Sequence, residues 1–328
     1  MSAIIWRPDG EKCPVTNLKD GNGVVVYYNL DGTEDFRITF LRWPVQPPNK
    51  NGEPSPAPAP APGTPRPKPR TPPNKVSPVP VNLSTSEAVG KPFTIPNLSM
   101  EMLWVKPGTF EMGSPSSEKD REDDETLHTV TLTQGFYLGK HEVTQAQWEK
   151  VMGSNPSGFK GGDRPVEQVS WTDVTSFCDK LTASERAAGR LPAGMTYQLP
   201  TEAQWEYACR AGTMTAFSFG DELTPKDANY AHDGFLSGTG LQRTSNVCEY
   251  PANPWGFHDM HGNVWEWCAD WSWDYPLLAG RPFARVLRGG SWHYSANDAR
   301  SASRGRARPG EACVNLGFRL SLRPPASK

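Results

Sequence analysis

Two short glycine-containing motifs near the C-terminus bracket the segment that most limits how this chain can fold. Residues 288–292 read Arg-Gly-Gly-Ser-Trp and residues 315–319 read Asn-Leu-Gly-Phe-Arg, and the stretch between them shows no repeat and no clear period. Glycine pairs permit backbone geometries that other residues resist. An irregular, polar stretch between rigid anchors is typical of a surface site rather than of a core. We therefore expect residues 292–315 to form a surface that binds or reacts.

The charge and hydropathy of the 328-residue chain exclude several classes of partner. The 34 Lys and Arg residues balance 36 Asp and Glu residues, so the overall charge does not indicate a nucleic acid or a membrane surface. No stretch approaches the roughly 18 apolar residues of a membrane span, and the N-terminus lacks the pattern of a signal peptide. We expect a cytoplasmic protein with no nucleic-acid and no membrane partner.

The N-terminal part divides into two regions of different composition. Residues 1–43 resemble a small β module, because Asp31-Gly32 separates two strand-like runs at residues 24–28 and 36–40. A piece of this length buries little core by itself, so it is expected to dock elsewhere, to recruit a partner, or to be a decorative hairpin. Residues 44–90 are rich in proline, which favours an extended spacer, with a Pro-x-x-Pro ligand as the alternative. This linker would join the β module, as a second interaction module, to a globular domain at residues 91–328.

Three helices in the globular part have recognisable first residues. Each start combines an N-cap residue with a partner three positions later, as in a capping box. The pairs are Thr144 and Gln147, Ser170 and Asp173, and Thr201 and Gln204. Gly212 is expected to end the third helix. Strands are expected at residues 102–105, 128–132 and 136–138, and the long C-terminal remainder is rich in loops.

Six motifs in a fixed order resemble a known family, the sulfatase-modifying-factor or formylglycine-generating-enzyme-like domain. They lie at residues 108–114, 140–145, 164–171, 199–207 and 262–267, and in the bracketing pair at 288–291 and 315–319. The resemblance covers about residues 95 to 324. It implies an α+β, C-type-lectin-like fold, loop-rich, here with the small N-terminal β module and the Pro-rich linker added. Family members include copper-dependent oxidases that convert a cysteine to formylglycine, non-haem-iron enzymes, and binding proteins, among them variable proteins diversified by retroelements.

The resemblance also identifies the positions at which the oxidases hold copper. Their two thiolates stand three residues after the Ser of the Arg-Gly-Gly-Ser motif and five residues further on, and such soft ligands suit copper(I). Those positions are Tyr294 and Ala299 here, and neither side chain supplies a thiolate. We therefore expect no copper site. An iron site is also not expected, because no H-x-x-x-H pair occurs among His141, His232, His258, His261 and His293.

A structural calcium ion is implied by the resemblance more strongly than any other cofactor. The matching ligands are the side chains of Asp259 and Glu266 and the backbone carbonyls of Gly262 and Val264. Oxygen donors of this kind suit calcium, although the two carboxylates could instead cap turns or pair with arginine. A second family calcium site departs from the pattern at His232, Asp233, Thr239 and Leu241.

The scattered cysteines are expected to be reduced. The six residues include no CxxC pair, and reduced, buried thiols are the ordinary state inside a cell. The resemblance implies that Cys178 and Cys209 form disulfides in some relatives. Their partner positions fall near Leu320 and residues 300–304, where no cysteine stands.

The irregular segment has the composition of an adaptable binding face. Aromatic groups and small hydrogen-bonding groups on loops are typical of such faces. Its candidate contact residues, called the contact face below, are Trp292, His293, Tyr294, Ser295, Asn297, Asp298, Ser303, Gly305, Ala307, Arg308, Val314 and Asn315. Apart from Trp292, each can be reached from an asparagine codon by changing adenines, as in retroelement-diversified proteins, whereas Glu311 does not fit. The nearby arginines at 300, 304, 306 and 308 could meet an acidic partner or pair internally with residues 118–125, Asp270 or Asp274.

These observations favour a non-catalytic module that binds an unknown protein or small molecule through residues 292–315. The alternative is an oxidoreductase of the family with an altered active site. The absence of the thiolate pair is the reason for preferring the binding module. A scaffold role for the N-terminal module and linker is the third hypothesis.

Overall fold

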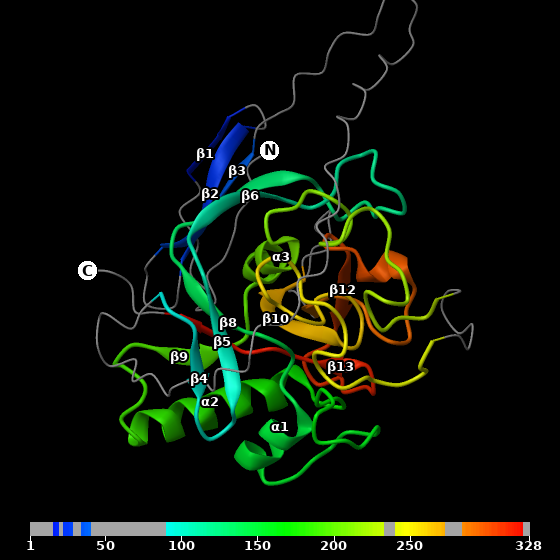
Figure 1. Ribbon diagram of the computed structural model, residues 1–328. Coiled ribbons are helices and arrows are strands. Elements are labelled where there is room, and N and C mark those ends of the chain that lie inside the picture. Colours follow the sequence, from blue (N-terminus) through cyan, green and yellow to red (C-terminus); the bar gives the residue numbers. More distant parts are fainter. Residues whose placement is uncertain are drawn as a thin grey trace, which may run out of the picture.

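The computed structural model describes the backbone of three N-terminal strands and, with side chains, residues 90–232, 240–272 and 284–323. These ranges form a mixed α+β structure in which loops are as prominent as regular elements (Figure 1). None of the helices in the described ranges is long and apolar enough to cross a membrane.

A five-stranded sheet unites both ends of the globular part. Its order is β4-β5-β8-β14-β9, with β4 at Phe93–Ile95, β5 at Met100–Val105, β8 at Phe136–Gly139, β14 at Ser321–Arg323 and β9 at Thr196–Gln198. The C-terminal strand β14 pairs antiparallel with both β8 and β9. The strand that follows the second motif therefore lies between β8 and β9 in this sheet.

Two helices pack beside this sheet and begin where the sequence predicts. Helices α1 (Gln145–Met152) and α2 (Trp171–Ala187) both have complete capping boxes, as expected. Their apolar faces meet through stacked rings of Trp148 and Phe177, whose centroids are 5.2 Å apart. Phe318 of the second motif packs edge-on against Phe177 at 5.4 Å. The motif thus contributes to the main core.

The third helix supports the sheet that carries the irregular segment. Helix α3 (Glu202–Arg210) also has its predicted capping box, but its left-handed C-cap is Ala211, one residue before the expected glycine. It packs on a four-stranded sheet of order β12-β11-β10-β13. The strands are β10 at Trp265–Trp271, β11 at Arg285–Arg288, β12 at Arg304–Ala307 and β13 at Leu316–Gly317.

The N-terminal strands extend a third sheet. Strands β2 (Asn22–Tyr28) and β3 (Glu34–Phe40) pair antiparallel, which confirms the predicted hairpin. Strand β1 is Thr16–Lys19, β6 is Gly108–Met112 and β7 is His128–Leu132. Strand β3 pairs antiparallel with β7, so the hairpin continues the β6–β7 sheet, away from α1 and α2 (Figure 1). The Pro-rich linker lies outside the described residues.

Candidate functional site

The first motif forms a glycine turn that brings two distant segments into contact. Gly289 and Gly290 have positive φ angles of 95° and 72°. A Cβ atom at Gly290 would lie only 2.9 Å from the Cα of Ala299. A side chain at this position would therefore be strained by the backbone angle and would also collide with the next turn. The glycine turn therefore holds the beginning of the irregular segment against the backbone of Ala299, in the middle of that segment.

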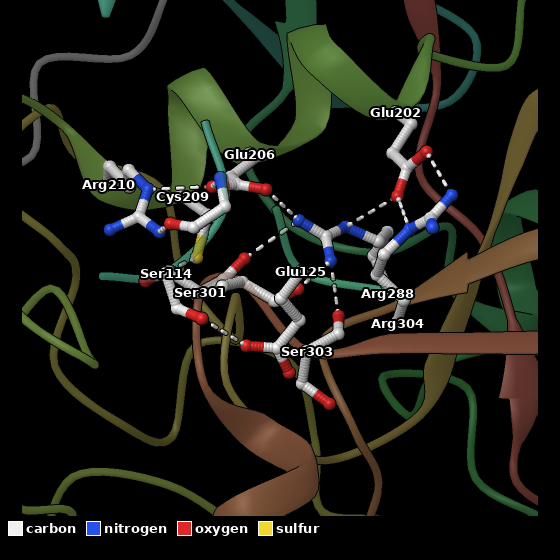
Figure 2. A network of polar contacts seen from close by, with 12 residues as sticks. Ser114, Glu125, Glu202, Glu206, Cys209, Arg210, Arg288, Ser301, Ser303 and Arg304 are labelled. Atoms are coloured by element: carbon white, nitrogen blue, oxygen red, sulfur yellow. Dashed lines mark hydrogen bonds and ion pairs between the residues drawn. The ribbon is translucent and has the colours of Figure 1, made fainter. Parts of the chain in front are cut away.

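A buried ionic network links the segment of the contact face to α3 (Figure 2). Arg288 is 0% exposed and donates to the carbonyl oxygens of Ser301 and Ala302 at 2.8 and 2.7 Å. It also pairs with Glu206 of α3, whose other oxygen accepts from Arg210 at 2.8 Å. Buried charges are tolerated only when paired and hydrogen-bonded in this way. The irregular segment is therefore held to α3 by charge-assisted bonds.

Two arginines within the segment form ion pairs with carboxylates of the same domain. Arg300 forms two bonds with Glu125, at 2.6 and 2.7 Å, and one with Glu118 at 2.8 Å. Arg304 donates to Glu202 at 2.6 and 3.0 Å. Internal pairing, one of the two alternatives that the sequence left open, is therefore confirmed for these two arginines. Arg300 pairs with the predicted residues 118–125. The apparent basic character of the segment does not by itself define an acidic partner.

Most of the contact face is accessible, with three corrections. Asn297 and Arg308 are exposed, and seven others are half-buried: His293, Tyr294, Ser295, Asp298, Gly305, Val314 and Asn315. Trp292, Ser303 and Ala307 are buried at 9%, 5% and 7% exposure. Ala307 packs in the main core from β12, because alternate side chains of a strand point to opposite faces. Ser303 precedes this strand, where its carbonyl oxygen accepts from Arg288. These three side chains are therefore largely withdrawn from an incoming ligand.

The two positions that match the oxidase thiolates have different roles here. The Tyr294 ring lies edge-on to Trp265 at 5.6 Å, and burial raises the pKa of its hydroxyl. Ala299 is fully buried, and its carbonyl oxygen is 2.7 Å from Nδ1 of His261. The other ring nitrogen of His261 accepts from the Ser218 amide at 3.1 Å. His261 is thus a satisfied buried residue that joins two loops.

The buried state of His261 predicts acid sensitivity. Burial lowers its pKa from 6.5 to about 4. Because the unfolded chain binds this proton more readily, stability is fully present above pH 6.5 and is lost as the pH falls towards 4. We expect the free energy of unfolding to drop over this window by about 3 kcal/mol from this group. Urea unfolding of wild type and His261→Gln at several pH values measures it, and equal slopes for the two proteins would contradict the assignment.

Phe159 is a contact residue that sequence reasoning missed. It lies in an irregular loop after α1, is half-buried, and its ring is perpendicular to Trp292 at 5.3 Å. The only signal in the sequence is a single aromatic residue within a Gly-, Ser-, Asn- and Pro-rich stretch at 153–163. Phe159 and Trp292 are far apart in the sequence, so local sequence patterns could not indicate that their rings meet.

Glu167 holds this loop at an energetic cost. The side chain is 0% exposed, and its Oε1 accepts from the Phe159 amide at 2.7 Å. Its Oε2 is buried without a hydrogen-bond partner in the described structure, and burial raises the carboxyl pKa. An unsatisfied buried polar atom costs about 1–3 kcal/mol.

The predicted calcium ligands Asp259 and Glu266 lie near a second buried carboxylate that has an unsatisfied oxygen, that of Glu142. Glu142, Asp259 and Glu266 are buried around one cation, Arg319, which pairs with Glu266 at 2.6 Å. Burial raises the pKa of Asp259 to about 6, and Oε2 of Glu142 has no partner in the described structure. Both oxygens of Glu266 already accept hydrogen bonds, from Arg319 and Trp205, which is the pairing with arginine that the sequence left open. The described ranges contain no group of three or more His, Cys, Asp or Glu side chains already arranged as a metal site, so the ion remains a prediction.

Cysteine thiols in the described ranges are unpaired with each other. Cys178, Cys209 and Cys268 are buried, whereas Cys248 and Cys313 are exposed, and all five are free. The Cys209 sulfur lies 3.6 Å from the Ser301 hydroxyl, within the 300–304 segment where the family resemblance places its disulfide partner. Of the second calcium site, Asp233 and Thr239 lie outside the described residues.

Comparison with known proteins places this geometry in a family. Residues 90–323 match the family described as the sulfatase-modifying factor enzyme 1-like domain. The chain belongs to this family. The formylglycine-generating enzyme of Streptomyces coelicolor is 37% identical over 205 residues, which are 55% of this chain and 59% of that protein. The sulfatase-modifying-factor-like domain therefore spans less than two thirds of this enzyme.

Solved structures confirm the predicted formylglycine-generating-enzyme-like, C-type-lectin-like fold. Treponema denticola variable protein 1 is 30% identical with a TM-score of 0.58, covering 72% of this chain and 99% of that one. PvdO from Pseudomonas aeruginosa is 28% identical with a TM-score of 0.61, covering 72% and 98%. The sulfatase-modifying-factor-like domain is thus similar both to enzymes and to a protein named as variable.

Proposed function

We propose that this sulfatase-modifying-factor-like domain is a non-catalytic binding module whose ligand meets the accessible part of the contact face. The observation that carries the proposal is the replacement of both thiolate positions by Tyr294 and Ala299. Tyr294 is half-buried against Trp265, and Ala299 is fully buried against the glycine turn. The fold keeps the shape of the site and gives it side chains suited to recognition.

The accessible residues have the chemistry of a binding surface. Tyr and His provide large contact areas with few rotatable bonds, and Ser, Asn and Asp provide adaptable hydrogen-bonding groups. The underlying network of Arg288, Glu206 and Arg300 holds the segment rigid without helices or long strands. A rigid support lowers the entropic cost of binding. The likeness to Treponema denticola variable protein 1 over 99% of that chain also supports a binding role.

A polypeptide ligand offers a direct test. Peptides are selected from a random phage-displayed library on the full chain, and a selected peptide is labelled for affinity measurement. We expect Asn297→Arg, at an exposed position, to weaken binding at least about tenfold, because it places bulk and charge on the surface. Lys180→Ala, on the exposed side of α2, is the control and should have no effect. Selected peptides that ignore Asn297→Arg and Tyr294→Ala alike would count against this surface.

The alternative is an oxidoreductase of the family with an altered active site, and it is supported by the 37% identity to the Streptomyces coelicolor enzyme. Structural calcium held by Asp259 and Glu266, with the Gly262 and Val264 carbonyls, is proposed for either function. Calorimetric titration with calcium after chelation tests it, and the absence of binding would rule the ion out. A cytoplasmic location, and the linker as a tether between modules, remain proposals.

A further inference from the structure

We propose that an apolar surface on β5, β6, α3 and the loop before β10 binds this chain's own proline-rich segment, residues 44–89. Its four side chains, called the aromatic patch below, are Leu103, Phe110, Tyr207 and Trp255. None of them belongs to the contact face, so the proposal is independent of the binding function above. The segment packs its proline rings on the patch and accepts hydrogen bonds through its carbonyl oxygens.

Three aromatic rings form the body of the patch. The ring of Tyr207 contacts those of Phe110 and Trp255, with centroids 5.0 and 4.9 Å away. Leu103 adjoins the turn of Trp255, because its Cδ1 is 3.5 Å from a Cβ atom placed at Gly256. Trp255 is 38% exposed, and the other three side chains are half-buried. The patch is therefore a continuous apolar surface that solvent reaches.

A buried asparagine holds the exposed indole in place. Asn253 is 5% exposed, and its Oδ1 accepts from the Trp255 amide at 3.0 Å. Its Nδ2 donates to the carbonyl oxygens of Ala208 and Cys209 at 2.7 and 3.1 Å. The turn that carries Trp255 is thus tied to α3, the helix that carries Tyr207. Because the surface is fixed in advance, binding to it costs little conformational entropy.

The proline-rich segment begins and ends on elements that carry or adjoin the patch. Its first end follows β3, which pairs with β7, and β7 pairs with β6, the strand of Phe110. Its second end reaches Gly90, whose amide donates to the Tyr137 hydroxyl at 2.9 Å. Tyr137 lies opposite Trp104, the neighbour of Leu103 on β5. Such a tether keeps the segment available to the patch at an effective concentration of roughly 1 mM.

The chemistry of the patch favours this segment over other ligands. The indole Nε1–H of Trp255 and the hydroxyl of Tyr207 are donors, and no described residue accepts from either. Proline alternates with Ser or Ala over residues 54–62, and proline has no N–H, so the segment offers mainly acceptors. Its preferred polyproline II form leaves these carbonyl oxygens free and suits aromatic surfaces. An anionic ligand would find no cation among the four side chains.

A labelled peptide with the sequence of residues 54–73 tests the proposal on two full-length chains. One chain is wild type, and in the other residues 54–73 are replaced by a Gly/Ser sequence of the same length. We expect fluorescence anisotropy to show at least about tenfold tighter binding to the Gly/Ser chain, because the tethered segment competes in wild type. Trp255→Ala in the Gly/Ser chain should weaken the peptide at least about tenfold. Met214→Ala is the control, at a side chain that is 53% exposed outside the patch.

Two further variants separate ring packing from hydrogen bonding. Trp255→Phe keeps an aromatic ring and removes the N–H donor, so its affinity for the peptide should lie between those of Trp255 and Trp255→Ala. A peptide in which every proline is replaced by alanine should bind at least about tenfold more weakly than the original. A proline-free peptide that binds equally well would overturn the assignment of a proline-rich occupant.

Three other results would also overturn the proposal. No binding of the peptide to the Gly/Ser chain would show that the patch is not a docking surface. Binding that Trp255→Ala leaves unchanged would place the peptide elsewhere. Equal affinity for the two chains, or a dimer that wild type forms and the Gly/Ser chain does not, would show that the segment does not occupy the patch of its own chain. Each of these results leaves the test of the contact face with Asn297→Arg unaffected.

Discussion

Replacing Arg288 by leucine should lower the free energy of unfolding by about 3–5 kcal/mol, the usual cost of removing one partner of a buried ion pair. Arg288 is 0% exposed, so its loss leaves the carboxylate of Glu206 with Arg210 as its remaining cation. The carbonyl oxygens of Ser301, Ala302 and Ser303 also lose their donor. The contact face should therefore loosen as the protein becomes less stable. Urea unfolding followed by tryptophan fluorescence measures the change.

A matched control comes from the same region of the sequence. The side chain of Arg308 is 75% exposed and reaches Glu311 only at 4.0 Å. Surface pairs of this kind contribute little, so Arg308→Leu should change stability by less than about 0.5 kcal/mol. Equal effects of the two substitutions would contradict the view that the buried network supports the segment.

Replacing Ser301 by cysteine should allow a disulfide with Cys209. The hydroxyl oxygen and the sulfur are 3.6 Å apart, and the two residues are 92 positions apart in the chain. Closing a loop of this length restricts the unfolded chain and should stabilise the protein by about 4 kcal/mol. Burial raises the pKa of Cys209 to about 12, so little thiolate forms at neutral pH and a strong thiol oxidant such as diamide is needed.

Mass spectrometry and unfolding curves of the oxidised and reduced forms measure this gain. The reduced variant should resemble wild type, and only the oxidised form should be more stable. Ser303→Cys is the control, because Ser303 is also buried, whereas the sulfur of Cys209 lies near Met260, His261 and Ser301. A disulfide that forms at position 303 and not at 301 would show that the segment is placed differently.

Local features of the structure follow directly from the sequence. The capping boxes at Thr144, Ser170 and Thr201 form as expected because all of their contacts lie within four residues. The hairpin of β2 and β3 is local in the same sense. Of the family motifs, the first of the bracketing pair forms the turn at Gly289 and Gly290, and the second places Phe318 in the main core.

Long-range contacts explain what sequence reasoning could not supply. Ala307 is buried because β12 pairs with β11 and directs this side chain into the core. Phe159 joins the contact face only because α1 and Glu167 place its loop against Trp292. The charges of Arg300 and of residues 118–125 are visible in the sequence, but their mutual distance is set by the fold.

The most direct test of a non-catalytic role is an oxidase assay on the full chain. The protein is incubated with copper(I), oxygen and a cysteine-containing peptide, and the peptide is followed by mass spectrometry. Tyr294 and Ala299 supply no thiolate for copper, so we expect the cysteine to remain unconverted and copper not to be retained after desalting. Conversion of the peptide cysteine to formylglycine, with turnover, would contradict the account.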